Sequence, residues 1–80
     1  MAEFNILVPS EIPEDETVLV IEVHFESGMA VTKNVPIFEI ETSKTAYVLA
    51  AEGGGTLNHQ LSVGDEVKSG QTLGVIFNGN

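Results

Sequence analysis

Lys44 lies halfway along this chain of 80 residues, where its amine is a candidate functional group. The chain has no cysteine, so it offers no thiol nucleophile, no disulfide and no cysteine zinc site. No hydroxyl stands beside a plausible base and no inward pair of carboxylates is evident, so we predict no catalytic residue. Redox chemistry would have to come from an attached group.

The residues around Lys44 predict that it lies at a turn. Ile40 and Tyr47 flank the polar segment, so a hairpin that joins them has Ser43 and Lys44 at its centre. Ser-Lys lacks the Asn-Gly or Asp-Gly pair of a type I′ turn, and we expect a type I turn in a longer loop. The amine would then lie far from the domain's own acidic surface and be accessible to another molecule. The alternative is an ordinary solvated lysine.

An internal repeat supports this placement. Residues 28–40 align with residues 64–76 at a shift of 36 residues, with glycines, valines and isoleucines coinciding. Two similar halves about a pseudo-twofold axis would place the joint between them at one end of the molecule and the termini at the other. The same shift lays Lys44 over Val8 and over Asn80, which predicts a tip opposite the chain ends.

The elements that must position this tip are short strands. Ile21, Val23 and Phe25 are expected on the core face of a strand and Glu22, His24 and Glu26 on the other face, the period of two that is typical of a half-buried strand. Similar runs recur between Gly, Pro, Asn and Ser turns. We therefore predict an all-β fold, a flattened eight-stranded barrel-sandwich of two pseudo-twofold-related halves, in one domain over residues 1–80. Residues 10–17, the acidic loop, are expected to be solvated.

The charge of the chain limits the classes of partner. The chain has twelve acidic residues, three lysines and no arginine. The resulting net charge of -9 disfavours binding to nucleic acid and to acidic membrane surfaces. A basic protein surface would be attracted, although such charge also serves solubility alone. Hydrophobic residues make up 42% with no membrane-length run, which predicts a soluble protein. The N-terminal residues lack a secretory signal, so we expect a cytoplasmic protein, with an organelle matrix left open.

The strand after the hairpin has an unusual outer face. Tyr47 and Leu49 are expected to face the core, which leaves Ala46, Val48 and Ala50 outward beside the lysine. This apolar strip is a possible docking surface. Alternatively, the acidic loop covers it, or its exposure is simply tolerated.

Two histidines and a glycine triplet receive structural interpretations. His24 lies between Glu22 and Glu26, which is more typical of a solvated face than of a metal site, and we predict no metal. His59 shares the phase of the neighbouring leucines, so we expect an inward histidine with a hydrogen-bond partner rather than a catalytic base. The glycines at 53–55 indicate a bend or a close backbone approach.

The segment 38–45, with Gly28 before it and Gly64 after it, resembles the lipoyl/biotinyl carrier domains. The stronger likeness is to lipoyl domains of the acyltransferase components of 2-oxo-acid dehydrogenase complexes. In that family a Glu-Thr-Asp-Lys-Ala motif forms a hairpin tip whose lysine is joined by an amide to lipoic acid. Glu41, Thr42 and Lys44 match the motif.

The resemblance implies a swinging-arm carrier with lipoate on Lys44. It implies that the modifying enzyme recognises Glu41, Thr42, Ser43 and Thr45. The implied partners are a lipoate protein ligase and dehydrogenase or acyltransferase subunits. Biotin at the same lysine, attached by a biotin protein ligase, is the alternative, although Ser43 and Thr45 replace the methionines that usually flank a biotinylated lysine. The family usually has Asp and Ala at these two positions, so an unmodified barrel that serves as an assembly or targeting module also stays open.

Overall fold

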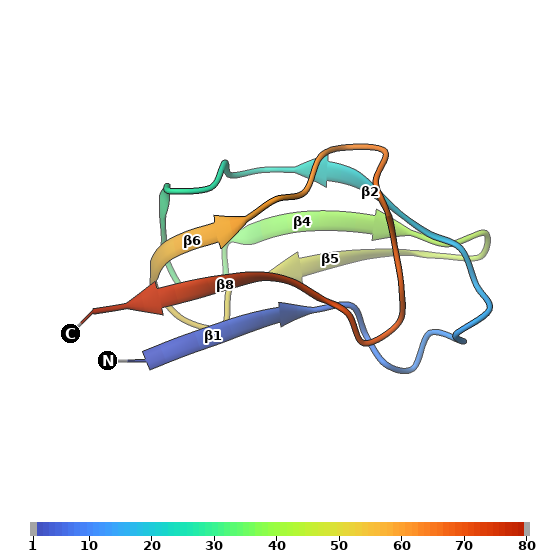
Figure 1. Ribbon diagram of the computed structural model, residues 1–80, viewed down its shortest axis with the longest axis horizontal. Helices are drawn as coiled ribbons and strands as arrows, with labels where there is room; N and C mark the ends of the chain where they lie inside the picture. The colour runs from blue at the N-terminus through green and yellow to red at the C-terminus, as the bar shows by residue number, and fades with distance from the viewer. Residues whose placement is uncertain (1, 80) are drawn as a thin grey trace.

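The computed structural model describes residues 2–79, and these residues form an all-β chain of eight strands in two antiparallel sheets (Figure 1). This confirms the predicted barrel-sandwich. The described part of the chain has no helix long and apolar enough to cross a membrane. The strands are β1 (Ala2–Leu7), β2 (Val18–Val23), β3 (Ala30–Val31), β4 (Pro36–Glu41), β5 (Ala46–Ala50), β6 (Gly55–His59), β7 (Glu66–Val67) and β8 (Thr72–Asn78).

The two sheets confirm the pseudo-twofold relation between the halves. One sheet has the strand order β1-β8-β6-β3 and the other has β5-β4-β2-β7. Exchanging β2 with β6, β3 with β7, β4 with β8 and β5 with β1 converts the second order into the first. The backbone repeats as well, because Gly28 and Gly64 have φ angles of 96° and 97°, and Asn34 and Gly70 have φ angles of 75° and 78°. Glycine and asparagine are the residues that adopt this left-handed region most readily.

The hairpin between β4 and β5 lies at one end of the molecule and the chain termini lie at the other (Figure 1). Ala2 pairs with Asn78 across β1 and β8, so the two ends are neighbours. The alignment of Lys44 with Val8 is wrong, because β1 corresponds to β5, which places Val8 in the position of Ala51. The other aligned residue, Asn80, lies outside the described residues.

A bulge in β2 changes which side chains face the core. The register between β2 and β4 shifts between Val20 and Glu22, so Ile21 is an extra residue without a partner on β4. Val18 and Val20 are buried before the bulge, and Val23 packs against the core after it. The prediction that Ile21 shares the core face with Val23 is therefore wrong, because a bulge reverses the alternation of side chains.

The core is filled from both sheets, and Phe38 is its largest fully buried side chain. The repeat places Gly74 in the position that corresponds to Phe38, and a Cβ on Gly74 would lie 3.5 Å from the Phe38 ring. One half thus supplies the ring and the other half supplies the space beside it. The buried hydrophobic residues are Ile6, Val8, Ile12, Val18, Val20, Val31, Ile37, Phe38, Ile40, Ala51, Leu57, Val67, Leu73 and Ile76.

The glycine triplet before β6 confirms the predicted close approach. A Cβ on Gly53 would strike the ring of Phe4, and a Cβ on Gly55 would strike the backbone oxygen of Phe77. Gly55 also has a φ of +153°, which side chains rarely allow. Glycine is therefore required where the chain crosses from one sheet to the other.

Candidate functional site

Lys44 lies at the tip of the β4–β5 hairpin, as the sequence predicts. Glu41 and Ala46 form the last paired rung, and Thr42 N–H donates a hydrogen bond of 2.8 Å to Thr45 O beyond it. The central residues of the turn, Ser43 and Lys44, both have negative φ angles. Among the described residues other than glycine, a positive φ occurs at Asn34. A type I′ turn requires positive φ at both central positions, so this turn belongs to another type, as expected.

The hydroxyl of Thr42 organises the turn. Its Oγ1 accepts hydrogen bonds from the backbone N–H of Lys44 at 3.1 Å and of Thr45 at 3.2 Å. Two backbone donors at the exposed tip are thus satisfied by one side chain. The resemblance assigned Thr42 to recognition by a modifying enzyme. In the structure Thr42 also fixes the position of the Lys44 backbone.

The surroundings of Lys44 are acidic. The Lys44 side chain is exposed. Within residues 2–79 the ion pair with atoms closer than 4 Å is that of His24 with Glu39, so the Lys44 ammonium has no carboxylate partner at that distance. A hollow of about 120 Å³ beside it is nevertheless lined by Glu11 and Glu16 of the acidic loop. The expectation that the amine lies far from the acidic surface is therefore wrong, because the loop packs next to the hairpin.

A hydrogen bond connects the acidic loop to the hairpin. Ser43 Oγ donates to Glu16 Oε1 at 3.2 Å, and Ile12 anchors the same loop in the core with 2% of its surface exposed. The loop therefore supports one side of the turn. Sequence reasoning missed this contact, since the two residues are 27 positions apart and neither carries a local signal.

The strip on β5 has the predicted orientation. Tyr47 and Leu49 pack against the core, whereas Ala46, Val48 and Ala50 are exposed. Val48 is 61% exposed, so the acidic loop does not cover it. The docking role of the strip stays a prediction.

His59 has the hydrogen-bonded environment that was predicted for it. Its Nδ1 accepts a hydrogen bond from Leu61 N–H at 3.0 Å, which leaves Nε2 to donate to Phe25 O at 2.8 Å. This pattern assigns the neutral tautomer with hydrogen on Nε2. The ring also meets Phe38 edge-on, with centroids 5.0 Å apart. These contacts of His59 stabilise the barrel, and none of them involves the β4–β5 hairpin turn.

His24 has a partner that the sequence did not predict. Its Nε2 lies 2.7 Å from Oε2 of Glu39 on β4, and among the described residues it forms no ion pair with Glu22 or Glu26. Both side chains are about one-third exposed, at 34% and 32%. In the described chain, no group of three or more His, Asp or Glu side chains has the spacing of a metal site. His24 and Glu39 therefore belong to the outer face of the sheet.

Thr42→Val tests the organisation of the turn. We expect this variant to lose about 1 kcal/mol of stability, because two backbone donors lose their acceptor while the side chain keeps its shape. Amide hydrogen exchange of Lys44 and Thr45 should become faster. Thr45→Val is the matched control, since the Thr45 hydroxyl makes no hydrogen bond within residues 2–79. Equal exchange rates in the two variants would contradict this role of Thr42.

Comparison with known protein families gives one match that spans most of the chain. The family model Biotin_lipoyl, described as biotin-requiring enzyme, matches residues 5–76. The matched segment contains the β4–β5 hairpin and both halves of the repeat. A search of curated proteins found no match.

Proposed function

The chain belongs to the Biotin_lipoyl family of carrier domains, and we propose that it carries a lipoyl group in amide linkage to Lys44. Members of this family bind lipoate or biotin covalently through a lysine. The family match therefore supports a carrier domain for one of these two groups. The attachment residue and the preference for lipoate are our proposal.

The observation that carries the proposal is the position of Lys44 at a tip that projects from the barrel. Lys33 lies in a turn, Lys44 lies in a bend, and Lys68 directly precedes a turn. The turns at Lys33 and after Lys68 are fastened to the barrel. Asn34 N–H donates to Ala51 O, and Gly70 N–H donates to Val8 O. The backbone hydrogen bond at the Lys44 turn closes within its own hairpin. An enzyme that must enclose a lysine has most access to this one.

The neighbours of Lys44 favour lipoate over biotin. Glu41 lies three residues before the lysine, as in the lipoyl motif that the sequence resembles. Ser43 and Thr45 flank the lysine, where biotin carriers usually have methionines. The exposed positions of Glu41, Ser43 and Thr45 make them available to a lipoate protein ligase.

The chain's contribution to the chemistry is presentation. After a ligase has activated the carboxyl group of lipoate, the deprotonated amine of Lys44 attacks its carbon and the activating group leaves. The amine's proton goes to solvent, and the new amide is neutral. The attached dithiolane supplies redox and acyl-transfer chemistry that protein side chains lack. Dehydrogenase or acyltransferase subunits are the partners that we propose, and no residue of this chain acts as their catalyst.

Intact-mass measurement tests which group is carried. The purified protein is incubated with ATP and either lipoate and a lipoate protein ligase, or biotin and a biotin protein ligase. We expect the addition of one lipoyl group in the first reaction and little addition in the second. Addition of biotin alone would transfer the assignment to biotin at the same family site. No addition in either reaction would favour an unmodified module of a larger enzyme.

A further inference from the structure

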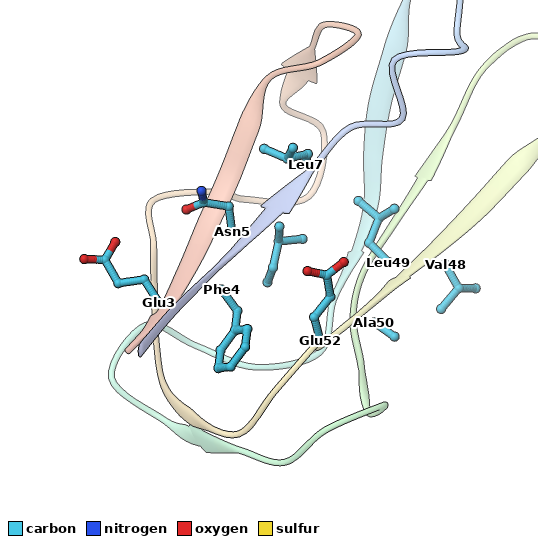
Figure 2. A pocket seen from close by; sticks show the side chains of 9 residues that line it. Glu3, Phe4, Asn5, Leu7, Val48, Leu49, Ala50 and Glu52 are labelled. Carbon is cyan, nitrogen blue, oxygen red and sulfur yellow. The ribbon is translucent and has the colours of Figure 1, made fainter. Parts of the chain in front are cut away.

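A groove runs between the edge strands of the two sheets. β1 is at the edge of one sheet and β5 is at the edge of the other. The space between them has a volume of about 510 Å³ and is lined by residues 3–7 of β1, residues 48–50 of β5, and Glu52 (Figure 2). The groove therefore lies between two strands that each lack a hydrogen-bonded neighbour on one side.

The open edge of β5 can be assigned to particular backbone groups. The hydrogen bond from Thr42 N–H to Thr45 O makes these two residues a hydrogen-bonded pair of the β4–β5 ladder. Such pairs alternate with non-hydrogen-bonded pairs along an antiparallel ladder. Tyr47 therefore directs its N–H and C=O toward β4, whereas Ala46 and Val48 direct theirs to the open side.

β5 lacks the features that usually protect an edge strand. Edge strands commonly carry lysine, proline or a bulge that discourages pairing with another chain. The sequence of β5 is AYVLA, with no charge and no proline. The outward side chain of Val48 on β5 is also 61% exposed. An added strand would find free backbone groups and apolar side chains together.

The charge of the groove indicates the kind of chain that fits it. Glu3 and Glu52 line the groove, and no lysine, arginine or histidine does. In Figure 2 the Glu52 side chain lies between the ribbons of β1 and β5, whereas the Glu3 side chain points away from β5. Neither carboxylate has a cationic partner within 4 Å in the part of the chain that the structure describes. A second copy of this chain would bring its own net charge of -9, so mutual repulsion disfavours self-pairing.

We propose that this groove binds an extended, basic segment of a partner protein. The segment adds to β5 as a further strand, exchanges backbone hydrogen bonds with Ala46 and Val48, and places a Lys or Arg beside Glu52. Backbone pairing supplies affinity and the Glu52 carboxylate selects for positive charge. This site is independent of the proposed modification, because it uses neither the amine nor the turn of Lys44.

The first test uses a synthetic capped hexapeptide of alternating Lys and Val, with the Glu-Val hexapeptide as its control. Both are titrated into the ¹⁵N-labelled, unmodified protein while amide chemical shifts and hydrogen exchange are recorded. We expect the basic peptide to shift the β5 amides and to slow exchange at Ala46 and Val48. Binding should weaken as ionic strength rises, since salt screens exposed charges. The acidic peptide should have no effect.

Two pairs of variants separate backbone pairing from charge. Val48→Pro removes a donor that points away from β4, and we expect peptide binding to weaken about tenfold, whereas Val48→Thr should bind nearly as the wild type does. Glu52→Gln should weaken binding about threefold, and Glu26→Gln, outside the groove, should leave it unchanged. If Val48→Pro does not fold, the variants that remove a carboxylate still test the proposal.

Three results would overturn the proposal. The first is peptide-induced shifts confined to the acidic loop, with no change at Ala46 and Val48. The second is equal binding of the acidic peptide. The third is protection of Ala46 and Val48 that grows with protein concentration in the absence of peptide, which would identify a second copy as the occupant. Lys44→Arg should bind the basic peptide as the wild type does, so failure of the lipoyl proposal leaves this test unaffected.

Discussion

Lys44→Arg should abolish attachment of the lipoyl group completely. Arginine keeps the positive charge and much of the length of lysine, but its guanidinium stays protonated and does not serve as the acylated amine. Lys33→Arg and Lys68→Arg are the matched controls, because both residues are exposed and lie in or directly before other turns. We expect both controls to be modified to the same extent as the wild type. Intact mass measures the extent of modification, and mass spectrometry of proteolytic peptides identifies the modified residue.

The interpretation of this result depends on an unchanged fold. Lys44 makes no side-chain hydrogen bond or ion pair within residues 2–79, so Lys44→Arg should melt within about 1 °C of the wild type. A modified Lys44→Arg protein would contradict the assignment of the attachment site. Loss of modification in all three variants would indicate that the ligase requires the lysines in another way.

Phe38→Ala should give the largest loss of stability among single substitutions in this chain. Phe38 is 0% exposed and meets the His59 ring edge-on, so its removal leaves a cavity at the centre of the barrel. We expect the free energy of unfolding to fall by about 3–5 kcal/mol. A domain of this size has about 5–10 kcal/mol in total, so much of the population could unfold. Urea denaturation followed by circular dichroism measures the change.

Two further variants control for chemistry and for cavity size. Phe77→Ala removes the same ring from a side chain that is 40% exposed, and it should cost clearly less than Phe38→Ala. Phe38→Leu fills part of the cavity and should keep the protein folded, with a smaller loss. A cost for Phe38→Ala no greater than that for Phe77→Ala would mean that the core relaxes around the missing ring.

The architecture could be predicted from the sequence because its signals are local and occur twice. Side chains that alternate with a period of two predict strands, and the glycines at 28 and 64 supply the positive φ that the same turn needs in both halves. The β4–β5 hairpin followed from the apolar residues Ile40 and Tyr47, which are register partners in the structure. Each of these features involves residues near one another in the chain.

The features that the sequence did not reveal depend on how distant strands align. The sequence around Ile21 does not distinguish a bulge residue from an ordinary strand residue. Ile21 is an extra residue only because of how β2 pairs with β4. The pairing of His24 with Glu39 follows from that register. The contact of Ser43 with Glu16 depends on where the acidic loop packs. Contacts of this kind require the assembled fold.

The position of the turn between β4 and β5 was predicted correctly, but the hydrogen bonds that support it were not. The sequence placed Lys44 at the apex, and the structure confirms that position. The hydrogen bonds that Thr42 Oγ1 accepts were missed, although Thr in a turn is known to bond to the backbone of the following residues. That rule could have identified Thr42 as the residue that fixes the backbone of Lys44.

The location of the chain ends determines how far the amine can travel when the domain is part of a larger assembly. A polypeptide joined to either end departs from the pole farthest from Lys44, and the long dimension of the domain is 39 Å. The barrel thus acts as a stiff spacer between tether and amine. A flexible tether would need about 50 more residues to gain the same root-mean-square span, and it would gain it without fixing a direction.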